Sequence, residues 1–448
     1  MSHAHVRSPG VSGTPRAGRT LRTVVVAILI AAGLATVAGL ALLWPDGGAV
    51  AHARSSIQFA APGTTFPTGR ITALSKDCPG YFSSDASATG SAPGDTRVCR
   101  MATVRLLDGA HAGKAVSLPL LWPWASAGLN VGDELELVVP PTSASSAAGS
   151  GSADPSTVQG VTVNGVVRDH SLLVWVIVFV VIVVVVGLLR GLMSLIALGF
   201  SAFVLVQFVL PAVISGRPGL AVAVVGASAI MFVVLYLAHG LSIRTSAALL
   251  GTLFGIAVTA GIAQLAVTTT HLTGVTGDVG GLLAGVTQID FRGLLTCAIV
   301  IAGLGVLNDV TVTQASAVWE LRAASPGLTR RQLYLRAMRI GRDHIASTIY
   351  TIAFAYAGAA MVVLIVLYLY DRPALSLLSQ EDLAAEVVRT LCSGIGLVLA
   401  VPATTAIAAL LVPREVVVSD RSAWDALRLR WYAFMPRPAV PEAPRREY

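Results

Sequence analysis

The sequence places an acidic residue, Asp309, inside an apolar stretch long enough to cross a membrane. A charged side chain at the centre of a membrane helix costs about 2.5 to 3.5 kcal/mol, so such a residue calls for a structural or functional reason. In a helix, Asp309, Thr313, Ser316 and Glu320 follow at i, i+4, i+7 and i+11 and share one face. We expect this polar stripe to face the protein interior or a water-filled path. Two interpretations stay open: a proton or cation site, and a hydrogen-bonded helix-packing network at the cytosolic end.

Neighbouring polar residues extend this candidate site. Asn308 precedes Asp309, and Asp343 and His344 stand at the start of the next apolar run, after a basic stretch. We therefore add Asn308 and Asp343 to the stripe as one candidate intramembrane polar site. An aspartate in the first turn of a helix also interacts favourably with the helix dipole, which would explain Asp343 without a functional role.

Motifs of well-known enzyme classes are not seen in the sequence. It has no H-E-x-x-H or G-x-S-x-G motif and no Cys/His cluster with metal-ligand spacing. Residues 109–115 resemble a phosphate-binding loop, but they are one residue short and end in Ala where Ser or Thr is needed. We expect no catalytic residues and no cofactor, and the sequence identifies no metal site. The net charge of +7 is not gathered into a basic patch with aromatics, so a nucleic-acid partner is not expected.

The elements that must position these residues are membrane helices. Hydrophobic residues make up 54% of the 448 and charged residues 12%, against about 25% charged in a soluble domain. A helix needs about 20 apolar residues to cross the hydrocarbon core. Stretches of about this length lie at 24–44, 172–189, 192–214, 220–238, 247–267, 293–313, 345–370 and 387–411. We predict an α-helical polytopic membrane protein with about eight transmembrane helices, namely an anchor at 24–44 and a seven-helix membrane domain at 172–411.

Arginines near the ends of these stretches indicate the orientation, because cytoplasmic loops carry an excess of Lys and Arg. With the N-terminus inside, 19 of the 31 Lys and Arg residues fall on the cytoplasmic side, including those of the basic segments 1–23 and 412–448. We therefore predict that both termini are cytoplasmic. The stretch 24–44 could also be a signal peptide, since Ala51-His52-Ala53 resembles a cleavage site. It exceeds the roughly 7 to 15 apolar residues of a signal peptide, so we favour a retained anchor.

Two places in this scheme are less regular. Only Arg190 and Gly191 separate the second and third stretches, which would have to form a very tight hairpin. Residues 268–291 are interrupted by glycines, yet 282–289 is apolar enough to dip into the membrane. Both a re-entrant segment and a plain loop or short surface helix fit this sequence.

Residues 46–168 change to short alternating runs, which predict half-buried strands in a small extracytoplasmic β-rich domain, a barrel or a sandwich. The expected strands cover 69–74, 97–107, 114–118, 133–139 and 160–167. Cys78 and Cys99 both fall in this segment, where a disulfide is plausible because the compartment is oxidising. Residues 141–157, rich in Ser, Ala and Gly, are expected to form a mobile loop. The pair Trp122 and Trp124 fits either a contact surface or core packing.

Several segments resemble the YibE/F-like family of bacterial multi-pass membrane proteins. The signature lies at 303–321, and further likeness covers 107–109, 131–133, 340–343 and 393–402. Asp309 matches the acidic residue of that signature directly, whereas Asn308 replaces an acidic residue. The resemblance implies the same architecture and a bacterial plasma membrane, and it adds little about mechanism.

These observations favour a permease or ion-linked secondary transporter that acts on an unknown small solute or ion. Asp309 would belong to its interior polar site, and the outer β domain would gate the path or collect the solute. The alternative is a non-transporting scaffold or accessory protein, whose β domain binds an envelope protein while the helices sit in the lipid bilayer.

Overall fold

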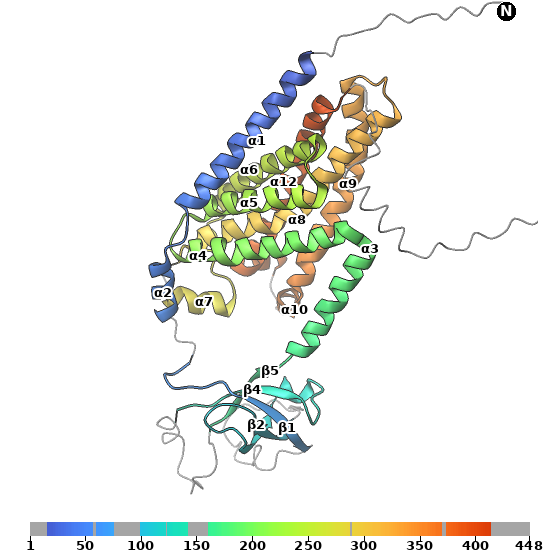
Figure 1. The fold of residues 1–448 in the computed structure, drawn as a ribbon. Coiled ribbons are helices and arrows are strands. Elements are labelled where there is room, and N and C mark those ends of the chain that lie inside the picture. Colours follow the sequence, from blue (N-terminus) through green and yellow to red (C-terminus); the bar gives the residue numbers. More distant parts are fainter. Residues whose placement is uncertain are drawn as a thin grey trace, which may run out of the picture. The chain divides into compact units, whose positions relative to one another are not determined.

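The computed structural model describes residues 16–56, 60–75, 99–121, 123–141, 160–286, 289–369 and 373–413. The chain divides into two compact units, drawn in Figure 1. The helical unit comprises Met1–Ala51 and Met193–Tyr448, and the β unit comprises His52–Leu192. The predicted class, a polytopic helical protein with a small β-rich segment after the first helix, is confirmed.

The β unit holds one five-stranded antiparallel sheet with the strand order β3-β2-β1-β4-β5. Its strands are β1 (Thr68–Ser75), β2 (Arg100–Leu106), β3 (Ala115–Leu120), β4 (Glu134–Val138) and β5 (Thr162–Val166). Alternate side chains such as Ala102, Val104 and Leu106 are buried in one core, as the period of two requires. Within the described residues β3 and β5 form the two edges. The described strands therefore form a half-barrel, whereas we expected a small barrel or a sandwich.

Turn residues hold the strands in register. Asp108 and Gly109 lie in the turn between β2 and β3: the Asp108 carboxylate accepts a hydrogen bond of 2.7 Å from the Thr68 amide, and Gly109 has a φ of 79°. Trp124 packs against the core of the sheet, whereas Trp122 and the loop 142–159 lie outside the described residues.

Of the two cysteines in the predicted disulfide, the structure describes Cys99. Cys99 is buried where β2 begins, and Cys78 lies outside the described residues. The bridge between them stays a prediction. The two cysteines of the helical unit, Cys297 and Cys392, are free and buried, as expected for small apolar side chains.

Most of the remaining described chain is helical. Their bounds are α1 (Arg16–Leu42), α2 (Gly47–Ser56), α3 (Asp169–Val204), α4 (Leu210–Ile214), α5 (Gly219–His239), α6 (Ile243–Thr269), α7 (Gly277–Val286), α8 (Phe291–Ala324), α9 (Arg330–Ala359), α10 (Met361–Leu369), α11 (Ala374–Leu378) and α12 (Glu381–Leu411). Six of the described helical segments are long and apolar enough to cross a membrane, or seven if the bent pair of α9 and α10 counts as one span. Eight were predicted, and the difference lies in α3.

The predicted spans 172–189 and 192–214 form one helical segment, Asp169–Ile214, instead of two helices joined by a tight hairpin. This segment is sharply kinked, because Leu188 has the non-helical angles φ 53° and ψ −136°. A Cβ atom on Gly191 would overlap the carbonyl of Val183, so only glycine fits there. The helix therefore continues through Arg190 and Gly191, and the break falls two residues before them.

The kink decides how many times the chain crosses. If Asp169–Ile214 crosses once, the seven spans put the termini on opposite sides, and the arginines between α8 and α9 become extracytoplasmic. A double crossing keeps them cytoplasmic, as the excess of Arg in that loop favours. The parts before and after Leu188 have 19 and 26 residues, or about 28 and 39 Å of helix, so each can reach across a core of about 30 Å.

Two more segments refine the prediction. Residues 268–291 contain the short helix α7, whose ten residues span about 15 Å, half of the hydrocarbon core. The predicted span 345–370 is broken at Ala360, where α9 and α10 meet at an angle of 68°. α1 packs into the helical unit, with Val25 and Leu29 buried in its core. Such packing fits a retained anchor, which stays a prediction.

α6, α8 and α12 pack against one another in the centre of the helical unit (Figure 1). Small residues let their backbones approach closely, as is common between membrane helices. A Cβ atom on Gly251 would overlap the Thr404 side chain, and one on Gly396 would overlap the hydroxyl of Thr259. These glycine–threonine contacts join α6 to α12 on both halves of their interface.

Candidate functional site

The predicted polar stripe lies mainly on the outer surface of α8. The Asp309 side chain is 75% exposed, Thr313 and Glu320 are exposed, and Ser316 and Asn308 are partly buried. The expectation that this stripe faces the protein interior is therefore wrong. α8 itself carries hydrophobic residues on every side, so the periodicity of its sequence does not reveal which face is inside.

The buried polar face of α8 consists of Thr311 and Gln314. The Thr311 hydroxyl lies 2.7 Å from that of Thr252 on α6. Nε2 of Gln314 donates to the Ala337 carbonyl of α9 at 2.9 Å and to Oγ1 of Thr405 on α12 at 2.8 Å. The hydrogen-bonded packing network that we considered for the stripe thus exists, but other residues of α8 form it.

Asp309 faces α9, where it meets a histidine. Its Oδ2 atom lies 3.9 Å from Nε2 of His344, which is close enough for an ion pair when the imidazole is protonated. Nε2 of His344 and the neighbouring Oδ1 of Asn308 are buried and have no hydrogen-bond partner within the described residues. Asp343 is exposed, and among the described residues it takes part in no ion pair.

A second polar group lies between α9 and α12, and we did not predict it. Glu386 and Arg389 form an ion pair one turn apart on α12, and Ser393 follows one turn later. Tyr356 of α9 interacts with Ser393 and with both charged side chains. Oε2 of Glu386 and Nε of Arg389 are buried without a hydrogen-bond partner in the described part of the chain, whereas the Ser393 hydroxyl interacts with that of Tyr356.

The two groups lie along one seam of α8, α9 and α12, which we call the polar seam. It comprises Asn308, Asp309, His344, Tyr356, Glu386, Arg389 and Ser393. Gly303 of α8 packs against Ser393, since a Cβ atom there would lie 3.3 Å from the hydroxyl oxygen. Asp309 follows Gly303 by six residues, about 9 Å of helix, and Glu386 precedes Ser393 by seven, about 10 Å. The seam is thus about 20 Å long, two-thirds of the hydrocarbon core.

The broken helix stands beside this seam. Tyr356 lies four residues before Ala360, where the chain turns by 68° from α9 into α10. Membrane transporters often build substrate and ion sites from discontinuous helices, because the break frees backbone groups inside the protein. The sequence carried a signal for this group, because Glu386 and Arg389 stand at i and i+3 where the predicted span 387–411 begins. We had selected neither residue for the site.

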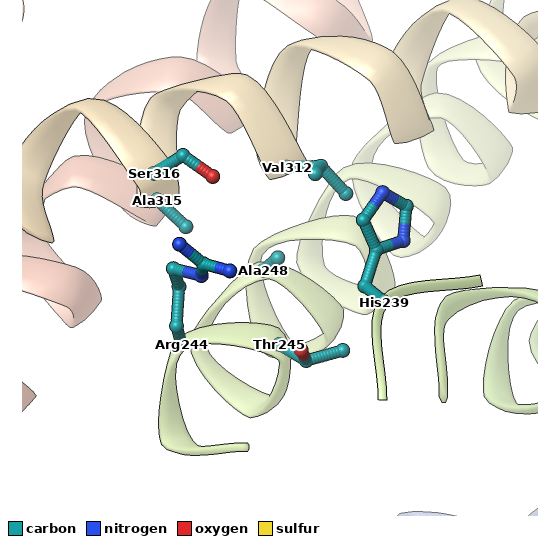
Figure 2. Close-up of a pocket in the computed structure, with 7 residues that line it drawn as sticks. All are labelled: His239, Arg244, Thr245, Ala248, Val312, Ala315 and Ser316. Atoms are coloured by element: carbon teal, nitrogen blue, oxygen red, sulfur yellow. The ribbon is translucent and has the colours of Figure 1, made fainter. Parts of the chain in front are cut away.

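Ser316, the partly buried residue of the stripe that is not in the polar seam, lies on another side of α8. It lines a small hollow between α5, α6 and α8 together with His239, Arg244, Thr245, Ala248, Val312 and Ala315 (Figure 2). This hollow and the polar seam lie against different neighbours of α8, since Asp309 pairs with α9. Within the described residues no cluster of three or more His, Cys, Asp or Glu side chains could hold a metal ion.

Comparisons with known proteins agree with the architecture. The family model described as YibE/F-like protein matches residues 175–414, which is more than half of the chain. The matched region includes every residue of the polar seam. Neither the curated proteins nor the solved structures gave a match.

Proposed function

Because the chain belongs to the YibE/F-like family of multi-pass membrane proteins, we propose that it is an ion-linked secondary transporter whose path follows the polar seam. Asp309 and His344 would exchange a proton or cation at one end of the seam. The ion pair of Glu386 and Arg389 would control access at the other end. We place the protein in a bacterial plasma membrane with the β unit outside. The proposal assigns no catalytic step and no cofactor.

The unpaired polar atoms of the seam support this proposal most directly. Each buried polar atom without a partner costs about 1 to 3 kcal/mol. Four such atoms in the described part of the chain lie on the seam, on Asn308, His344, Glu386 and Arg389. Together they would cost about 4 to 12 kcal/mol, which is comparable to the whole stability of a typical domain. Water, an ion or a polar solute in the seam would satisfy them.

Asp309 fits the role of the side chain that gains and loses its charge during the proposed transport. Facing lipid, its carboxylate would cost about 2.5 to 3.5 kcal/mol, whereas protonation or contact with water removes that cost. A protonated His344 would form an ion pair with the charged carboxylate at 3.9 Å. In the proposed function, a proton or cation would bind at this pair.

The test is proton flux in proteoliposomes of phosphatidylethanolamine and phosphatidylglycerol that contain a trapped pH dye. Under an imposed membrane potential, the parent protein should carry protons faster than empty vesicles. Asp309→Asn and His344→Gln should abolish this flux, while the control Glu320→Gln, an exposed carboxylate eleven residues along α8, should keep it. Flux in Asp309→Asn equal to that of the parent, or a parent no faster than empty vesicles, would contradict the proposal.

The accessory-protein reading makes the opposite prediction in cells. If the protein acts through its β unit, cells in which residues 46–168 are deleted should behave like cells that lack the gene. Cells with Asp309→Asn should then behave like the parent. A transporter should show the reverse sensitivity at Asp309.

A further inference from the structure

The hollow around Ser316 is lined by one arginine and one histidine, Arg244 and His239. Arg244 comes from the first turn of α6, and His239 from the last turn of α5. Figure 2 shows the Arg244 guanidinium turned toward Ser316 and the His239 ring beside Val312. Arg244 is partly buried, and within the described residues no carboxylate forms an ion pair with it. A partly desolvated guanidinium of this kind attracts an anion.

The size of the hollow limits what can enter. Its free space is about 10 Å³, which is about the volume that one water molecule needs. One oxygen atom of an anion can therefore enter, while the rest of the ligand stays outside. Val312, Ala315 and Ala248 give the hollow apolar walls, and the Ser316 hydroxyl offers a hydrogen bond.

The position of the hollow indicates the source of the anion. Arg244 stands in the short connection between α5 and α6, which the charge distribution places on the cytoplasmic side. Ser316 lies eight residues before the end of α8, or about 12 Å. The hollow is thus near the level of the lipid headgroups, where basic pockets between helices bind anionic lipids.

We infer that Arg244, His239 and Ser316 form a binding site for a phosphate group, supplied by an anionic phospholipid of the inner leaflet or by a free phosphate. The site is separate from the polar seam and independent of the transport proposal. One phosphate oxygen enters the hollow, and the guanidinium binds the others by charge-assisted hydrogen bonds. The acyl chains of a lipid would remain outside the protein.

Binding of defined lipids to the full-length, delipidated protein tests this site by native mass spectrometry. The probes are phosphatidylglycerol, diacylglycerol, which lacks the phosphate, and inorganic phosphate. Phosphatidylglycerol should bind the parent about tenfold more tightly than Arg244→Gln, since charge-assisted hydrogen bonds are lost. Diacylglycerol should not distinguish the two proteins. The control Arg331→Gln removes an exposed arginine of α9 and should bind like the parent.

The arms of the experiment separate the two sources. Binding of phosphatidylglycerol that depends on Arg244 identifies a lipid site, and binding of inorganic phosphate alone with the same dependence identifies a free phosphate. Ser316→Leu fills the hollow and keeps the arginine, so it should weaken binding even if Arg244→Gln does not fold. If neither probe distinguishes the parent from both variants, the inferred site does not exist.

Discussion

Gln314 holds together the three helices that form the polar seam, and replacing it by methionine tests how firmly. The side chain is only 2% exposed and donates to the Ala337 carbonyl and to the Thr405 hydroxyl at 2.9 and 2.8 Å. Methionine has nearly the same length and volume, so Gln314→Met removes the two hydrogen bonds without opening a cavity. Gly341 keeps the site tight, since a Cβ atom there would lie 3.0 Å from Oε1 of Gln314.

The expected loss follows from what remains bonded. Hydrogen bonds between membrane helices contribute about 0.6 kcal/mol on average and about 1.7 kcal/mol at most. The Thr405 hydroxyl still donates to the Val401 carbonyl at 2.7 Å, and the Ala337 carbonyl remains an acceptor within α9. Neither partner is therefore orphaned. We expect Gln314→Met to lower the free energy of unfolding by about 1 to 2 kcal/mol.

Unfolding of the detergent-solubilised protein by sodium dodecyl sulfate, followed by circular dichroism, measures this loss. Gln264→Met is the matched control, because Gln264 is exposed on α6 and the same substitution breaks no buried bond there. It should change the free energy by less than about 0.5 kcal/mol. If Gln314→Met destabilises the protein no more than this control does, the three-helix bridge contributes nothing to stability.

The remaining predictions concern packing and topology. Gly396→Ala should destabilise by about 1 to 3 kcal/mol through overlap with Thr259, and adding Thr259→Ala should restore most of the loss. Gly394→Ala, where a Cβ atom meets nothing within 4 Å, serves as the control, and equal effects of the two alanines would refute the close contact. If α3 crosses the membrane twice, the cysteine in Arg190→Cys should react with an impermeant maleimide only after the membrane is opened. Labelling in intact cells would instead mean a single crossing.

The strands were predictable because each repeats a simple pattern. All five expected strands appear within three residues of their predicted ends, since alternating burial and the turns at Gly109 and Gly132 fix them locally. Whether the sheet closes into a barrel was not predictable, because closure depends on which strands pair across long connections. Spans were equally clear from apolar length, but length alone does not reveal the kink at Leu188 or the break at Ala360.

The candidate site was predicted in part. Asp309 and Asn308 were selected from their position in a span, and the structure brings Asp309 within 3.9 Å of His344, which we had named beside Asp343 but had not added to the site. The inward face of α8 could not be derived, because an apolar helix can bury any of its sides and the choice depends on its neighbours. Tyr356, Glu386, Arg389 and Ser393 come together only through the packing of α9 on α12, which one sequence does not show.

The glycine–threonine contacts between α6 and α12 constrain how this molecule can move. Where a backbone without a Cβ atom rests directly on a side chain, as at Gly251 and Gly396, one helix cannot slide along the other without collision. These two helices therefore behave as one rigid pair, and α8 packs against both. The elbow at Ala360, by contrast, turns the chain by 68° between α9 and α10. If the proposed transport function holds, movement at this elbow, and not sliding of α6 along α12, would open the polar seam.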